Sequence, residues 1–170
     1  MSATNKAVFL DRDGVINSDE GHYYIYRPSD FVLCEGVVDA LKLLHNLGYL
    51  IVIITNQGGV SKGVYTKADV ESVHQKFIDI MSCHNVPIAA IYYCPHHSAN
   101  ENCLCRKPQP LMIEKAVARF NIDKEKSFML GDRATDVQTG VSAGIRGFQM
   151  PTNGNLLEAV KECLKAMSNK

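Results

Sequence analysis

The sequence AVFLDRDG, residues 7–14, decides the fold and supplies the first candidate site residues. Its first half is apolar, and its second half is acidic and ends in glycine. A short apolar run bounded by polar and glycine residues is typical of a fully buried strand, so we predict a strand over residues 7–10. Asp11 and Asp13 follow directly after it, and their side chains can lie on the same side because they are two positions apart in extended chain.

Further apolar runs of this kind alternate with segments in which apolar residues recur at helical spacing. The predicted strands cover residues 7–10, 50–54, 88–93, 127–130 and 147–150. The predicted helices cover residues 37–47, 66–81 and 111–120, a segment that ends near residue 144, and residues 156–167. Thr66 and Asp69 fit a capping box at the start of the second helix, with Asp in place of Glu. The alternation predicts an α/β fold with a Rossmann-like, doubly wound and largely parallel sheet, in one domain over residues 1–170.

The composition argues against a nucleic-acid-binding or membrane protein. Hydrophobic residues make up 46% of the 170 residues, and 18 Lys and Arg balance 18 Asp and Glu. A net charge of zero provides no overall attraction to nucleic acid or anionic lipid. No apolar run approaches membrane-spanning length, and residues 1–6 are too short and too polar for a signal peptide. We therefore expect a soluble cytoplasmic protein without nucleic-acid or membrane partners.

Polar clusters follow four of the predicted strands. They are Asp11 with Asp13, the TNQGG sequence at 55–59, a Cys/His cluster that leads into Arg106 and Lys107, and the GDRATD sequence at 131–136. Ligands of parallel α/β sheets bind beyond the carboxyl ends of the strands, so the four clusters should converge on one crevice. Three aspartates at strand ends, Asp11, Asp13 and Asp132, suit Mg²⁺. Any one of them could instead be a helix cap, but capping does not explain all three.

These residue types fit phosphoryl transfer. An aspartate carboxylate can act as nucleophile through an aspartyl-phosphate, and the transferred group needs its charge neutralised. Thr55 and Asn56 could donate hydrogen bonds to phosphoryl oxygens, while Gly58 lets backbone N–H groups approach. Lys107 could supply positive charge. Taken alone, the TNQGG sequence at 55–59 would be a plain turn, and Lys107 would be an ordinary surface lysine.

A second cluster predicts zinc. Cys94 and His96 are separated by one residue, as are Cys103 and Cys105, and the pairs lie close together in the sequence. Three thiolates and one imidazole suit a tetrahedral structural Zn²⁺, held in a loop over about residues 94–108. Such a loop would bring Arg106 and Lys107 to the rim of the crevice. Without an export signal the cysteines should be reduced, and the remaining three should belong to the core: Cys34, Cys83 and Cys163.

The four strand-end clusters together resemble the motifs of the haloacid dehalogenase superfamily of phosphatases. The resemblance covers nearly the whole chain. It implies that Asp11 is the nucleophile, that Asp13 is general acid and then general base, and that Thr55 and Lys107 steady the transferring group. It implies Mg²⁺ held by the Asp11 side chain, the Asp13 backbone carbonyl and Asp132. Asp136 would support the site from the following helical turn.

The zinc loop narrows the resemblance to two groups that have only a minimal cap. One group is the D-glycero-D-manno-heptose 1,7-bisphosphate phosphatases, which resemble this chain around residues 9–23 and 91–97. The other is the histidinol-phosphate phosphatases, which resemble it at residues 131–136 and in the short zinc loop. The first resemblance covers more of the chain, so we favour hydrolysis of the heptose 7-phosphate over histidinol phosphate. With so small a cap, one chain could suffice for catalysis on a small-molecule phosphate, which favours a monomer.

A heptose substrate implies a set of contacts around the crevice. The predicted substrate-binding residues are Asp19, Glu20, Gly21, His22, Asn56, Gln57, Gly58, Arg106 and Arg133. The stretch 19–22 could equally be an ordinary surface loop. Two other classes remain as alternatives. A DNA 3′-phosphatase should have a basic groove, which the net charge disfavours. A zinc-binding module without enzymatic activity would not need the four motifs.

Overall fold

The structure, a computed structural model, describes residues 4–169. Residues 1–3 lie outside the described residues, and they belong to the N-terminal segment in which no signal peptide is expected. Residue 170, the last of the predicted domain, also lies outside them. None of the helices in the described part of the chain is long and apolar enough to span a lipid bilayer.

Five strands alternate with five α-helices along residues 4–169. The strands are β1 (Lys6–Leu10), β2 (Tyr49–Asn56), β3 (Ala90–Cys94), β4 (Phe128–Gly131) and β5 (Arg146–Gln149). The helices are α1 (Val37–Asn46), α2 (Lys67–Cys83), α3 (Leu111–Phe120), α4 (Ala134–Ser142) and α5 (Leu156–Ser168). A short 3-10 helix, η1 (Pro28–Asp30), lies in the loop between β1 and α1.

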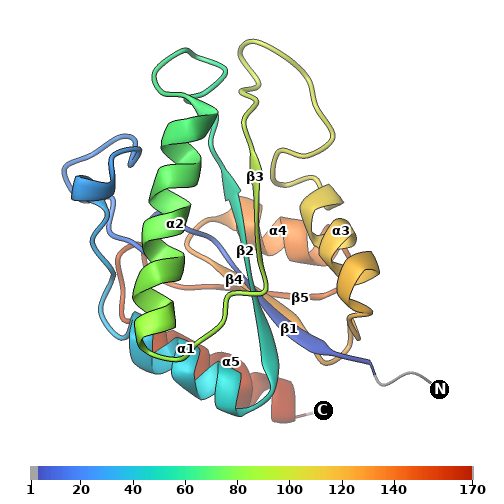
Figure 1. Cartoon of the computed structure of the whole chain (residues 1–170). Helices are drawn as coiled ribbons and strands as arrows, with labels where there is room; N and C mark the ends of the chain where they lie inside the picture. The colour runs from blue at the N-terminus through green and yellow to red at the C-terminus, as the bar shows by residue number, and fades with distance from the viewer. Residues whose placement is uncertain (1–3, 170) are drawn as a thin grey trace.

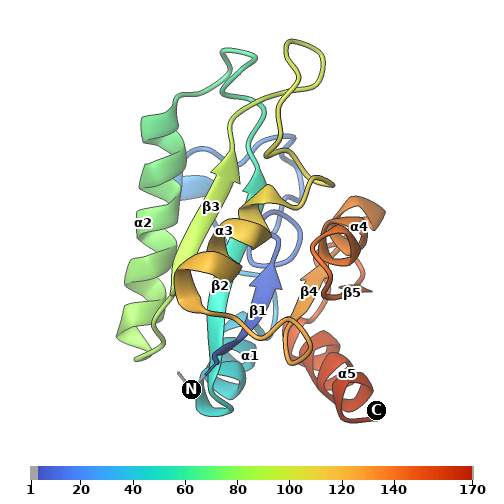
Figure 2. The same cartoon turned by 90° about the vertical axis from the view of Figure 1, so that its right-hand side faces the viewer.

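The strands form one parallel sheet in the order β3-β2-β1-β4-β5. Helices α1, α2 and α5 cover one face, and α3 and α4 cover the other (Figures 1 and 2). The chain moves outward from β1 in both directions, so the carboxyl end of β1 lies at the point where the order reverses. The predicted doubly wound α/β fold is confirmed, and ligands of such folds bind at that point.

Alternation along the central strand β1 explains the two cores. Val8 and Leu10 pack with α1, α2 and α5, whereas Ala7 and Phe9 pack with α3 on the opposite face. All four side chains are fully buried, as expected for a strand covered on both faces. The buried strand thus delivers Asp11, the next residue, to the carboxyl edge of the sheet.

Three loops rise beyond this carboxyl edge and enclose the site. They are residues 11–36 after β1, residues 57–66 after β2 and residues 95–110 after β3 (Figure 1). Among the described residues no further domain is inserted in these loops, so they provide the minimal cap that the resemblance implies.

The predicted elements are all present, with small differences at their ends. The capping box of α2 is confirmed, since the Thr66 hydroxyl accepts from the Asp69 N–H and the Asp69 carboxylate accepts from the Thr66 N–H. Strand β3 begins at Ala90 rather than residue 88, because Ala90 is the first residue of β3 that pairs with β2. The hydrogen bond from the Ala89 N–H to β2 directly precedes this pair. The prediction that Cys83 belongs to the core is wrong: it is the last residue of α2 and is exposed.

Helix α1 offers a test of the packing with a matched control. Leu41 is fully buried against the sheet, whereas Leu47, the C-cap residue directly after the same helix, is 44% exposed. Leu41→Ala should lower the free energy of unfolding by about 2–5 kcal/mol, because it leaves a cavity. Leu47→Ala should change it by no more than about 0.5 kcal/mol. Urea denaturation of both variants measures this, and equal losses would contradict the assignment of the core.

Candidate active site

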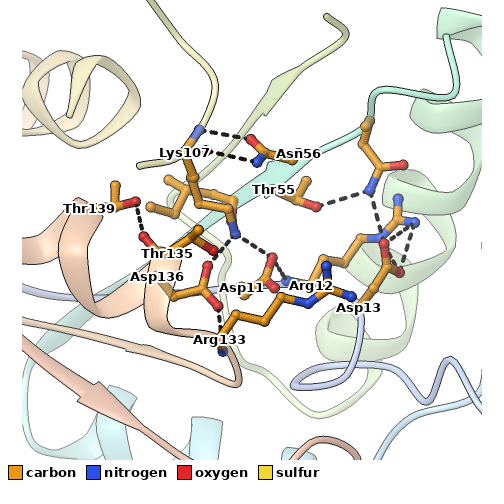
Figure 3. A network of polar contacts seen from close by, with 12 residues as sticks. Asp11, Arg12, Asp13, Thr55, Asn56, Lys107, Arg133, Thr135, Asp136 and Thr139 are labelled. Atoms are coloured by element: carbon orange, nitrogen blue, oxygen red, sulfur yellow. Dashed lines mark hydrogen bonds and ion pairs between the residues drawn. The ribbon is translucent and has the colours of Figure 1, made fainter. Parts of the chain in front are cut away.

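Asp11 lies at the centre of a polar network beyond β1 (Figure 3). It is 8% exposed. Its Oδ1 accepts from the Lys107 ammonium at 2.7 Å and from the Arg12 N–H at 2.8 Å. Burial raises the pKa of Asp11 to about 7, although the charge of Lys107 opposes this rise. These contacts fix the carboxylate in one orientation, as a nucleophile requires.

Lys107 is a buried cation whose position is fixed at both ends. Its ammonium donates to Asp11 and to Asp136, each at 2.7 Å, and to the Ile54 carbonyl at 3.2 Å. Burial alone would lower the pKa of Lys107, but the two carboxylates raise it above its usual value. The Asn56 side chain accepts from the Lys107 N–H at 2.9 Å and donates to its carbonyl at 3.3 Å. Asn56, predicted to bind substrate, therefore ties Lys107 to the end of β2.

Three carboxylates, those of Asp11, Asp132 and Asp136, have oxygens within 4.8 Å of one another. Among the described side chains, Asp132 Oδ1 is a buried acceptor without a hydrogen-bond partner. Its Oδ2 accepts from the Thr152 hydroxyl at 2.8 Å. Burial raises the pKa of Asp132 as it does that of Asp11, and a cation beside them would favour both ionised forms. This donor set fits the Mg²⁺ that the motifs predict.

Two neighbours refine the candidate magnesium site. Asp136 is occupied at both oxygens, because Oδ1 accepts from Lys107 and Oδ2 from the Arg133 N–H. Its contacts therefore fit a partner of Lys107 better than a metal ligand. Gly14 has a φ of +82°, and a Cβ there would lie 2.6 Å from Asp132 Oδ2. Only glycine lets the loop after Asp13 approach Asp132 this closely.

The Asp13 side chain is held by a set of side-chain donors that differs from the donors to Asp11. It accepts from Arg12 at 2.9 Å, from Asn17 at 3.0 Å and from Gln57 at 3.1 Å. Gln57 also donates to the Thr55 hydroxyl oxygen at 2.9 Å, so the Thr55 O–H remains a possible donor to a phosphoryl oxygen. The proposed acid/base group and the predicted phosphate donor are thus joined through one amide.

A cavity of about 250 Å³ opens above these residues. Of the predicted site residues, its lining includes Asp11, Asp13, Asp19, His22, Thr55, Asn56, Gln57, Gly58, Arg106, Lys107 and Arg133. Glu20 and Gly21 do not line this cavity. Tyr23, Tyr24, Tyr65 and His97 also contribute to it, so aromatic rings and cations face the same space.

The predicted zinc ligands come together in the loop after β3. Cys94 Sγ lies 3.6 Å from His96 Nδ1 and from Cys103 Sγ, and 3.0 Å from Cys105 Sγ. The four donor atoms lie within 4.8 Å of one another, as ligands of a single tetrahedral zinc must. The next residue, Arg106, donates to the His96 carbonyl at 3.0 Å. The cluster could therefore hold zinc and fix the segment that carries Arg106 and Lys107.

Several residues of the site escaped the sequence analysis. Thr152 and Asn153 follow β5, and Asn153 exchanges hydrogen bonds with Asp19. Arg12 and His74 form a buried contact beside Asp13, at 3.2 Å. The fifth strand had no recognised motif after it, although the rule that ligands bind at strand ends could have pointed to Thr152.

The fold and this site define a phosphatase of the haloacid dehalogenase class. A family described as polynucleotide kinase 3 phosphatase matches residues 6–153. Curated relatives named D-glycero-beta-D-manno-heptose-1,7-bisphosphate 7-phosphatase are 36–41% identical to this chain. The chain therefore belongs to this phosphatase family, as a homologue of the heptose bisphosphate phosphatases.

Three examples show the extent of the similarity. The Helicobacter pylori (strain J99) relative is 38% identical over 92% of this chain and 88% of its own length. The Escherichia coli (strain K12) relative is 36% identical over 85% of this chain and 78% of its own. The crystal structure of D,D-heptose 1,7-bisphosphate phosphatase from B. bronchiseptica, complexed with magnesium and phosphate, superposes with a TM-score of 0.83. It is 25% identical and covers 95% of this chain and 99% of its own.

The position of the zinc cluster predicts that phosphatase activity depends on bound zinc. Cys105→Ser should reduce bound zinc from about one per chain to nearly none. It should also lower phosphatase activity by about 10²-fold, because Lys107 lies two residues further on and would lose its fixed position. Cys83→Ser, at an exposed cysteine, is the matched control and should keep both. Metal analysis beside turnover measures this, and full turnover by zinc-free protein would contradict it.

His74 predicts a pH dependence of stability. Burial and the neighbouring Arg12 charge lower the pKa of His74 to about 3, although Asp13 opposes the shift. The unfolded chain binds a proton at this histidine below about pH 6.5, and the folded protein does so only near pH 3, so stability falls as the pH falls between them. From pH 7 to pH 5, the free energy of unfolding should drop by about 2 kcal/mol more in wild type than in His74→Gln.

Chemical denaturation at the two pH values measures this difference. His45→Gln, at an exposed histidine of α1, is the control and should follow wild type. Parallel losses in wild type and His74→Gln would contradict a neutral, buried His74.

Proposed function

We propose that this chain is a Mg²⁺-dependent phosphatase that hydrolyses the 7-phosphate of D-glycero-D-manno-heptose 1,7-bisphosphate. The observation that carries the proposal is the Asp11–Lys107–Asp136 arrangement beside the unpartnered oxygen of Asp132. It supplies a fixed carboxylate nucleophile, a buried cation and a site for a divalent ion. The names of the curated relatives supply the substrate.

The reaction would proceed in two displacements. The Asp11 carboxylate attacks phosphorus, and the bond from phosphorus to the sugar oxygen breaks. Asp13 gives its proton to that oxygen, leaving an aspartyl-phosphate. Asp13 then takes a proton from a water that attacks the same phosphorus, which releases phosphate and restores Asp11.

The remaining groups would stabilise the transferring phosphoryl group. Mg²⁺, when held by Asp11, Asp132 and the Asp13 backbone carbonyl, would neutralise charge on the phosphoryl oxygens. Lys107 and the Thr55 hydroxyl would contribute to the same end from the protein, without reorganisation during the reaction. Because Lys107 is pinned by two carboxylates and a carbonyl, its charge stays where the new charge develops.

The substrate's sugar would lie toward the cap loops. Asp19 and His22 of the loop after β1 line the cavity, and so do Arg106 of the loop after β3 and Arg133 after β4. We propose that the first pair binds hydroxyl groups and that the arginines bind the second phosphate. Glu20 and Gly21, which do not line the cavity, stay predicted substrate contacts.

A DNA 3′-phosphatase is the second candidate, because the family description carries that activity. Against it, the chain has no net charge, and Asp19 places a carboxylate in the lining of the cavity. A polyanionic strand gains affinity from basic surfaces and loses it near acidic ones. Histidinol phosphate, left open by the motifs, receives no support from the names of the reported relatives.

We propose further that residues 1–170 act as one phosphatase domain and as a monomer, since every group invoked above comes from one chain. The cytoplasm is the compartment that suits its chemistry. The described cysteines are all free thiols, and a thiolate-bound zinc requires them to stay reduced.

A substrate panel tests this function. Wild-type protein with Mg²⁺ should release phosphate from heptose 1,7-bisphosphate at least about 100-fold faster, in kcat/KM, than from histidinol phosphate or a 3′-phosphorylated oligonucleotide. Asp11→Asn should abolish turnover, because it removes the nucleophile. Asp39→Asn, at an exposed residue of α1, is the matched control and should keep it. Preference for the oligonucleotide would overturn the substrate, and activity in Asp11→Asn would overturn the mechanism.

A further inference from the structure

Arg12 stands between the two aspartates of the first motif, and its side chain is almost completely buried. It is 1% exposed, the largest of the fully buried side chains in the described part of the chain. Burying a guanidinium is costly unless it is paired and hydrogen-bonded, and an apolar side chain of similar size could fill the same space. The retained charge therefore calls for a role beyond packing.

All three nitrogens of the guanidinium have partners, which come from three segments of the chain. Two of its nitrogens donate to Asp13, with Nε at 3.0 Å and Nη2 at 2.9 and 3.1 Å. Nη2 also donates to the Ile25 carbonyl at 2.6 Å, and Nη1 contacts His74 Nε2 at 3.2 Å. The paired bonds to Asp13 set the plane of its carboxylate as well as its position.

His74 accepts from Arg12, because a guanidinium can only donate. Its Nε2 must therefore carry no proton, and the ring is neutral with its proton on Nδ1. The ring is buried in α2 and packs edge-to-face on Tyr93 of β3, with ring centroids 5.7 Å apart. Helix α2 and strand β3 thus hold His74, the acceptor that orients the Arg12 side chain.

We propose that Arg12 is a positioning residue for Asp13, and that His74 of α2 in turn orients Arg12. The inference rests on the proposed function, in which Asp13 protonates the leaving oxygen. Asn17 and Gln57 also hold the Asp13 carboxylate, but each donates a single bond to one oxygen. Of these three donors, only Arg12 reaches both oxygens of Asp13.

A set of phosphate monoesters that differ in the acidity of the leaving alcohol tests this role. A good leaving group such as 4-nitrophenolate needs little proton donation, whereas benzyl alcohol needs it fully. The constant kcat/KM reports the steps up to the formation of the phospho-enzyme, so it isolates the half-reaction in which Asp13 acts as acid. A misaligned acid therefore steepens the dependence on the leaving group, and general loosening of the fold does not.

We expect Arg12→Lys to lower kcat/KM about 100-fold on benzyl phosphate and no more than about 3-fold on 4-nitrophenyl phosphate. His74→Leu should give about 10-fold and about 2-fold losses, since Arg12 keeps its other partners. His74→Gln keeps an acceptor in reach of Arg12 and should stay within about 3-fold of wild type on both esters. Asp13→Asn gives the slope expected when the acid is missing.

Lys76 supplies a matched structural control. Like His74 it lies on α2, and it ties this helix to the loop after β1 through the Pro28 and Phe31 carbonyls, without touching Arg12 or Asp13. Lys76→Met should leave the leaving-group slope unchanged. Circular dichroism and thermal midpoints verify that each variant is folded.

The outcomes separate the inference from the function it rests on. Equal losses on the two esters in Arg12→Lys and His74→Leu, or the same slope change in Lys76→Met, would overturn the positioning role alone. A wild-type protein without Mg²⁺-dependent turnover of any ester would overturn the proposed function and the inference with it. Steeper slopes in Arg12→Lys and His74→Leu, with the wild-type slope kept in His74→Gln and Lys76→Met, would support the inference.

Discussion

The ion triad formed by Lys107 with Asp11 and Asp136 is the interaction on which the site depends. All three residues are less than one-tenth exposed, so each charge would be costly without the other two. The triad joins the end of β1, the start of α4 and the loop after β3, three segments distant in sequence. Folding around it fixes the nucleophile relative to the cation before any substrate is bound, which is the arrangement that electrostatic catalysis requires.

The triad has a net negative charge, because Lys107 balances only one of its two carboxylates, and Asp132 beside it adds to this negative charge. Lys107 is fully used by Asp11 and Asp136, while Asp132 is held on one oxygen by Thr152 and bare on the other. Anions crowded at low dielectric repel one another unless a cation lies between them. The same excess of negative charge would repel a phosphate ester, so a divalent cation both completes the site and permits the substrate to enter.

The sequence predicts the fold and the centre of this site because both follow from local patterns. Strand-end clusters place Asp11, Lys107 and Asp132 at one edge once the sheet is parallel, and close spacing reveals the Cys/His cluster. It does not predict the contacts of Arg12 with His74 or of Asp132 with Thr152. Those pairs depend on which helix covers β1 and where the chain returns after β5. A buried His on an amphipathic helix or a Thr in a turn has no local pattern that separates it from an ordinary core or loop residue.

The triad alone does not choose between a sugar phosphate and a DNA end, because both present the same phosphate monoester to Asp11. The choice must lie in the cap loops, which surround whatever the phosphate is attached to. Asp19 is fixed there by Asn153, and Arg106 is fixed by the His96 carbonyl within the zinc loop. A small cavity lined by both a carboxylate and a cation suits a compact ligand that carries both hydroxyl groups and a second phosphate. The zinc loop, which also positions Lys107, therefore links the specificity of the site to its chemistry.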